Sequence, residues 1–217
     1  MTIIHKTIDA ARNHPAYLLA LGISPLIIKS QSTLSAITVS VAYLLILLLS
    51  SISVSALRRF TPQQTHLVFI LIITSTWTTV IDLLMQVWFY EMRLLMDIYI
   101  PIIAMNSLLL MFLQTEALQY PVSKIITRLL LPVGLVILLC VITGATREIL
   151  AYGQVFSDSE LLIPSMSGAS FRLIPDTMVL PLFNKVAGGF MVLGCVIALL
   201  NLMLQKYKIA SAAYLGQ

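Results

Sequence analysis

The stretch LSAITVSVAYLLILLLSSISVSAL, residues 34–57, decides the fold class of this 217-residue chain. It carries no charged side chain and exceeds the roughly 20 apolar residues that a helix needs to cross a bilayer. In the whole chain 59% of residues are hydrophobic and 10% are charged, and the mean hydropathy is +0.98. Soluble domains carry about 25% charged residues. The composition therefore predicts an integral membrane protein, and it excludes a disordered chain.

Further apolar stretches predict six membrane-spanning helices in all. Their expected bounds are 16–29, 34–57, 66–89, 97–119, 124–146 and 180–204. A short lead, 1–15, precedes a single membrane domain, 16–206, and a tail, 207–217, follows it. The segment 147–179 is too polar to cross a bilayer, so we expect it to form an extramembrane loop. The expected fold class is thus an all-α integral membrane protein.

The distribution of basic residues favours cytoplasmic termini. With the N-terminus inside, eight Lys and Arg residues fall on the inner face: Lys6, Arg12, Arg58, Arg59, Lys124, Arg128, Lys206 and Lys208. Five fall on the outer face: Lys29, Arg93, Arg147, Arg172 and Lys185. Cytoplasmic loops carry the excess of basic residues in membrane proteins, which favours this orientation.

Two of the predicted spans contain a proline close to polar residues. In the first span Pro25 follows Leu21-Gly22-Ile23-Ser24, and in the fourth span Pro101 precedes Asn106-Ser107. Three spans in each half would place the halves in opposite orientations. The pattern predicts two inverted three-helix repeats whose broken first helices meet near the bilayer midplane. The alternative is an ordinary kink at each proline.

Charged residues within the spans are candidates for function. Asp82 lies deep in the third span, where it would act as a cation or proton relay, or else pair with a Ser, a Thr or Trp77. Glu116 lies near the end of the fourth span, and we expect it at the membrane interface. Arg147 and Glu148 close the fifth span, and we expect them to form an ion pair that anchors the outer loop.

The cysteines and histidines indicate no metal site. Cys140 and Cys195 lie in apolar stretches, where a cysteine is usually a small core residue. The three histidines stand outside the spans or at their edges, with no carboxylate or cysteine at ligand spacing. The sequence also lacks a Ser-His-Asp order and a glycine-rich phosphate loop. These absences argue against a self-contained hydrolase or kinase, and the scattered basic residues argue against a nucleic-acid partner.

Several stretches, in the same order along the chain, resemble one family of membrane proteins. They are His14-Pro15 to Leu21-Gly22, Ser55 to Pro62, Asp82, Ile102 to Ser107, Thr146 to Ile149 with Gly153 and Phe156, and Pro181 to Asn201. They resemble the six-helix membrane components of the Rnf electron-transport complex and of the sodium-pumping NADH:quinone reductase, in particular the E component of Rnf and the D component of the reductase. The resemblance implies a bacterial inner-membrane subunit that is not catalytic alone. It also implies a homologous, inverted sister subunit as partner in a pseudo-symmetric core.

The resemblance further implies an iron–sulfur centre, to which each half-repeat of the family gives one cysteine. The matching positions here are Ser24 and Ser107. A serine hydroxyl ionises poorly and is a weak iron ligand beside a thiolate. We therefore expect no cofactor in this copy.

Two functions follow from these observations. The first is a subunit of an ion-translocating electron-transport complex. The second is a cluster-free relative, either a structural subunit or a small transporter of cations or solutes. In that case Ser24, Asn106, Ser107 and Asp82 would line a polar midplane site, because hydroxyl and carbonyl oxygens suit a hard cation such as Na⁺.

Overall fold

The computed structural model describes residues 26–60, 62–155, 171–172 and 180–215. Its longer helices are α3 (Thr33–Leu57), α4 (His66–Trp88), α8 (Val122–Tyr152) and α9 (Val186–Leu215). Three short helices, α5 (Tyr90–Met96), α6 (Tyr99–Ile103) and α7 (Ser107–Phe112), lie between α4 and α8 in the chain. A π-helical turn, Leu113–Ala117, continues α7.

Four helical segments of the described chain are long and apolar enough to cross a membrane: Thr33–Leu57, His66–Trp88, Tyr99–Ala117 and Val122–Tyr152. They match the predicted second to fifth spans. In α9 only Val186–Leu199 forms an apolar stretch, which is shorter than the others. The predicted first span lies mostly outside the described residues. Its last four residues, 26–29, are described and are helical. The chain is thus a multi-pass helical membrane protein.

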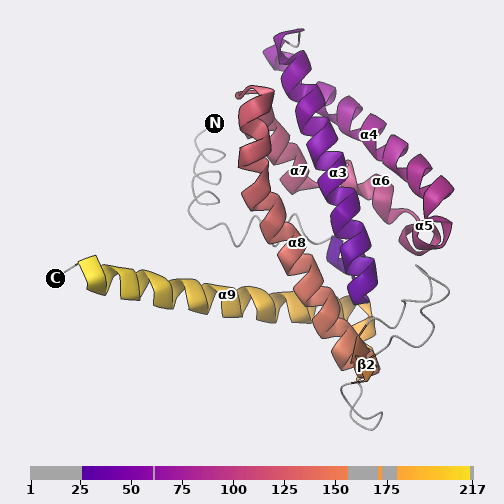
Figure 1. Ribbon diagram of the computed structural model, residues 1–217, viewed down its shortest axis with the longest axis vertical. Helices are drawn as coiled ribbons and strands as arrows, with labels where there is room; N and C mark the ends of the chain where they lie inside the picture. Colours follow the sequence, from indigo (N-terminus) through magenta and orange to yellow (C-terminus); the bar gives the residue numbers. More distant parts are fainter. Residues whose placement is uncertain (1–25, 61, 156–170, 173–179, 216–217) are drawn as a thin grey trace.

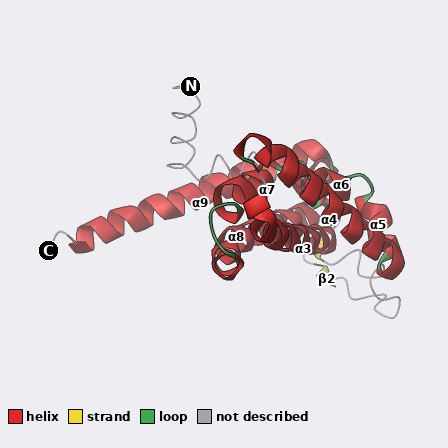
Figure 2. Cartoon of the chain, turned by 90° about the horizontal axis from the view of Figure 1, so that it is seen from above, coloured by secondary structure: helices red, strands yellow, loops and turns green. Residues whose placement is uncertain are grey.

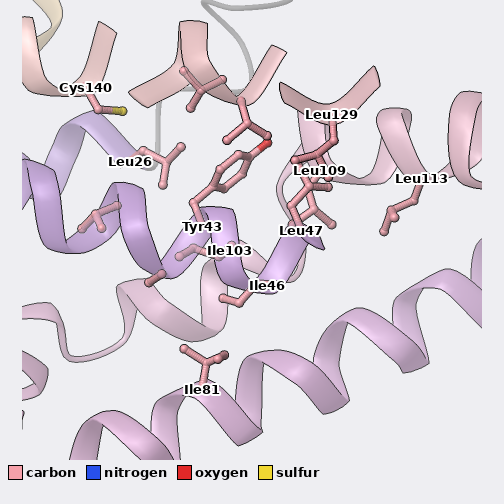
Figure 3. Packing of buried hydrophobic residues seen from close by; sticks show 14 of the residues in the cluster. Leu26, Tyr43, Ile46, Leu47, Ile81, Ile103, Leu109, Leu113, Leu129 and Cys140 are labelled. Carbon is pink, nitrogen blue, oxygen red and sulfur yellow. The ribbon is translucent and has the colours of Figure 1, made fainter. Parts of the chain in front are cut away.

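Helix α3 lies at the centre of the bundle, against α8 on one side and α4 on the other (Figures 1 and 2). Figure 3 shows buried side chains of these helices in one apolar cluster, among them Ile46, Leu47 and Leu129. Helices α3 and α8 approach each other closely at Gly144. A Cβ atom there would lie 2.6 Å from the Cβ of Ala36 and 3.1 Å from the carbonyl oxygen of Ser32. Glycine therefore permits the close approach of the two helices.

The fourth span is broken, as predicted, but the break comes after Pro101 and not at it. Pro101 lies in the first turn of α6, where a missing N–H costs little. The helix ends at Ile103, and Asn106 takes an extended conformation with ψ 125°. Its side-chain oxygen accepts hydrogen bonds from the N–H groups of Leu108 and Leu109, at 2.9 and 3.4 Å. Asn106 therefore caps the new helix α7.

The segment that follows α8 departs from the all-α expectation, because it contains a short pair of strands. Helix α8 continues to Tyr152, beyond the predicted end of the fifth span at Thr146, and Gly153 closes it in a left-handed conformation with φ 69°. Strands β1 (Gln154–Val155) and β2 (Phe171–Arg172) then form a short antiparallel pair. A 3-10 helix, Pro181–Asn184, leads into α9. Figures 1 and 2 both show the C-terminal part of α9 extending away from the other helices.

Candidate functional site

A small polar cavity lies between α4 and the broken fourth span. Its volume is about 170 Å³, and it is lined by Ser75, Thr78, Thr79, Asp82, Pro101 and Ala104. The hydroxyl groups of Thr78 and Thr79 donate to carbonyls one turn earlier, those of Thr74 and Ser75. Their oxygens therefore keep lone pairs as acceptors. The cavity thus presents a carboxylate and hydroxyl oxygens, which is the ligand chemistry of water and hard cations.

Asp82 forms a two-point ion pair with Arg93 of α5. Arg93 Nε lies 3.1 Å from Oδ1 and Nη2 lies 3.2 Å from Oδ2, and Gln86 Nε2 donates to Oδ2 at 3.3 Å. The hydrogen bond to Asp82 raises the pKa of the Arg93 guanidinium, so this cation stays charged. The alternative predicted from the sequence, in which Asp82 pairs with a Ser, a Thr or Trp77, is wrong, because the partner of Asp82 is Arg93. The Trp77 indole N–H donates instead to Ser53 Oγ at 2.8 Å.

The residues at the break differ in exposure. Asn106 is buried because its side chain caps α7, whereas Met105 and Ser107 are exposed. Ser24, the other predicted site position, lies outside the described residues. The described part of the chain brings no three His, Cys, Asp or Glu side chains together for a metal. The donor at Ser107 is a hydroxyl, which does not fit an iron–sulfur cluster.

Glu116 lies at a second polar position, away from the Asp82 cavity. The π-helical turn carries it, and its Oε2 accepts a hydrogen bond from Arg128 Nη1 at 2.7 Å. The Arg128 guanidinium also lies over the ring of Tyr120, 3.8 Å from the ring centroid. Glu116 is therefore half of a charge pair between the fourth span and α8.

Arg147 and Glu148 do not form the predicted ion pair with each other; the salt bridges among the described residues join Arg93 to Asp82 and Arg128 to Glu116. The Glu148 carboxylate instead accepts hydrogen bonds from the backbone N–H and hydroxyl of Thr33, at the start of α3. A negative charge is favourable at a helix N-terminus.

Within the described part of the chain, the fully buried Arg147 guanidinium binds backbone carbonyls only. It donates to Ile27 at 2.7 Å and Ser30 at 2.9 Å, and to three consecutive carbonyls at the end of the 3-10 helix, those of Phe183, Asn184 and Lys185. We call Arg147 and these carbonyls the carbonyl cage. It joins the segment before α3, the helix α8 and the start of α9. Sequence reasoning missed this cage, since every residue has a carbonyl and no side chain indicates it.

Comparisons with known proteins agree with the resemblance seen in the sequence. Residues 3–197 match the family described as "Rnf-Nqr subunit, membrane protein". The chain is 33% identical over 192 residues to the E component of the ion-translocating oxidoreductase complex of Pseudomonas paraeruginosa, which covers 88% of this chain and 80% of the relative. A relative of the same name from Thioalkalivibrio sulfidiphilus is 31% identical over 207 residues, 93% of this chain and 90% of that protein. The chain belongs to the Rnf-Nqr family of membrane subunits.

Proposed function

We propose that this chain is a subunit of an Rnf-type ion-translocating oxidoreductase complex in a bacterial inner membrane, with both termini in the cytoplasm. In the complex it forms half of a pseudo-symmetric core with a homologous, inverted sister subunit. The names of the relatives support membership of such a complex, and they favour it over the independent transporter.

Exposed residues near the middle of α4 and at the break of the fourth span support the proposal of a sister subunit. Ser75 and Thr79 are exposed on α4, near the middle of that helix, and Met105 and Ser107 are exposed at the break of the fourth span. We call these four residues the break face. Irregular backbone at membrane depth is found against protein or water and not against lipid. Small and hydroxyl-bearing side chains also allow close helix packing in membranes.

Cross-linking tests whether another subunit covers the break face. The experiment replaces the exposed Cys195 by Ala and introduces Ser107→Cys, with Leu138→Cys as control. Leu138 is 52% exposed on α8 and belongs to an apolar surface. In native membranes Ser107→Cys should cross-link to a protein that mass spectrometry identifies as a second Rnf-Nqr subunit, and Leu138→Cys should not. Equal products from both positions would contradict the proposal.

We also propose that this copy holds no iron–sulfur cluster at the family positions. The support is chemical, because Ser107 offers a hydroxyl where the family offers a thiolate. The test is iron analysis and visible spectroscopy of the complex purified through this chain. Iron bound through this subunit would disappear in a complex with Ser107→Ala. Such a loss would overturn the proposal, whereas an unchanged iron content supports it.

Asp82 is the ion-relay residue in this proposal. Its carboxylate faces the 170 Å³ cavity, and Arg93 balances its charge when no other cation is present. Asp82→Asn should therefore abolish cation uptake by proteoliposomes that contain the complex. Asp97→Asn is the control, because Asp97 is exposed in the turn between α5 and α6. Full uptake by the Asp82 variant would exclude this role.

A further inference from the structure

A second and larger cavity lies between α3, α7 and α8. Its volume is about 360 Å³, which is within the range of small-molecule sites. Leu47, Leu108, Phe112 and Val133 are among its apolar lining residues. Neither the proposed subunit function nor the relay role of Asp82 uses this cavity. Its apolar walls suit a hydrocarbon chain, and its polar groups indicate which head group is attached to that chain.

Opposite charges lie together among the residues that line this cavity. Glu116 and Arg128 both line it, and they remain partly accessible, with 29% and 45% of their side chains exposed. A π-helical turn, a feature frequent at functional sites, carries Glu116. Such a pair complements a zwitterionic group, since Arg128 can bind an anion while Glu116 binds a cation that donates hydrogen bonds.

A deep hydroxyl group completes the set. Tyr43 lines the cavity and is only 2% exposed. Its hydroxyl has no hydrogen-bond partner among the described residues. The oxygen is not completely enclosed by that part of the chain, so it can still accept or donate a hydrogen bond. Figure 3 shows the ring extending from α3 towards the side on which Leu129 lies. Since a buried hydroxyl usually has a partner, this donor indicates that the cavity receives an acceptor.

We propose that this cavity binds one molecule of phosphatidylethanolamine. The phosphate lies at Arg128, the ammonium group at Glu116 and an ester carbonyl of the glycerol at the Tyr43 hydroxyl. The first part of an acyl chain lies along the apolar wall. Phosphatidylcholine lacks the N–H donors that Glu116 requires, and phosphatidylglycerol lacks the cation. The complementary charges thus distinguish this lipid from the other two.

Native mass spectrometry of the full chain, purified with the subunits that accompany it, tests the proposal. The protein is placed in nanodiscs with equal amounts of phosphatidylethanolamine, phosphatidylcholine and phosphatidylglycerol. Phosphatidylethanolamine should be retained, and its binding constant should fall about tenfold or more in Arg128→Gln and Glu116→Gln, which remove a charged partner, and several-fold in Tyr43→Phe, which removes a neutral hydrogen bond. Lys124→Gln is the control, since Lys124 is exposed on α8 and does not line the cavity.

Each outcome decides the question. Tyr43→Phe removes a single oxygen, so it separates lipid binding from disruption of the charge pair. Retention that falls in the three variants and persists in the Lys124 variant supports the proposal. Overturning results are preferential retention of phosphatidylglycerol or phosphatidylcholine, no retained lipid, or equal retention in all variants. Since lipid retention is measured without ion transport, the result is independent of the proposed relay at Asp82.

Discussion

Two glycines of α8 provide a matched test of how closely α3 and α8 approach. Gly144 faces α3, where an added Cβ would meet Ala36 at 2.6 Å, whereas an added Cβ at Gly134 would find nothing within 4 Å. Both positions lie inside one helix, so Gly→Ala brings each the same gain in helix propensity, about 0.5–1 kcal/mol. The two variants therefore differ only in what the new methyl group contacts.

The expected difference is the cost of over-packing at Gly144. Nonbonded carbon atoms prefer separations of about 3.5–4.0 Å, so α3 and α8 would have to move apart by roughly 1 Å. Inserting a methylene into a well-packed core costs about 1–3 kcal/mol. Gly134→Ala should thus be neutral or stabilising, and Gly144→Ala should have a free energy of unfolding lower than Gly134→Ala by about 1–3 kcal/mol.

Equilibrium unfolding of the full chain in mixed micelles with increasing SDS measures this difference. Circular dichroism reports the loss of helix, and both variants are compared with the unchanged protein under the same conditions. If Gly144→Ala were as stable as Gly134→Ala, the close contact between α3 and α8 would be refuted. A reversed order would refute it as well.

The same titration tests three other features. Arg147→Gln should lower the free energy of unfolding by at least about 1–3 kcal/mol, because buried carbonyls of the carbonyl cage lose their donor. The exposed Arg59→Gln should change it by less than about 0.5 kcal/mol, and equal effects would contradict the cage. Asp97→Gly should raise stability by up to about 1 kcal/mol, since Asp97 has φ 43°, and a loss would argue against backbone strain there. A double-mutant cycle of Asp82→Asn and Arg93→Gln should give a small favourable coupling, as expected for a partly exposed pair, and zero coupling would exclude the pair.

The apolar stretches predict the helices well, because a bilayer requires helical backbone over a fixed length. The predicted second span, 34–57, and the observed α3, Thr33–Leu57, differ by one residue at the start. The broken fourth span was also predictable, since Pro101 and Asn106 mark it. The sequence did not show which residue makes the break. Asn106 does so by capping α7, which is a local hydrogen-bonding choice.

Partners of the charged residues were harder to predict. Asp82 pairs with Arg93 because the chain turns after α4 and brings α5 back beside it. That turn depends on the backbone at Phe89, with φ −137° and ψ 53°, and no glycine or proline marks it. Arg147 and Glu148 are adjacent in sequence, and in a helix adjacent side chains do not face each other. The expected ion pair could have been rejected on that ground.

The carbonyl cage has a consequence for biosynthesis. Arg147 joins Ile27, near the start of the described chain, to Lys185, which is synthesised much later. Until residues 183–185 leave the ribosome, the guanidinium lacks three of its five acceptors. The end of the bundle that contains Arg147 therefore closes late, after the first four long apolar segments have been translated. A truncated product that stops before Phe183 would lack these three acceptors of the Arg147 guanidinium.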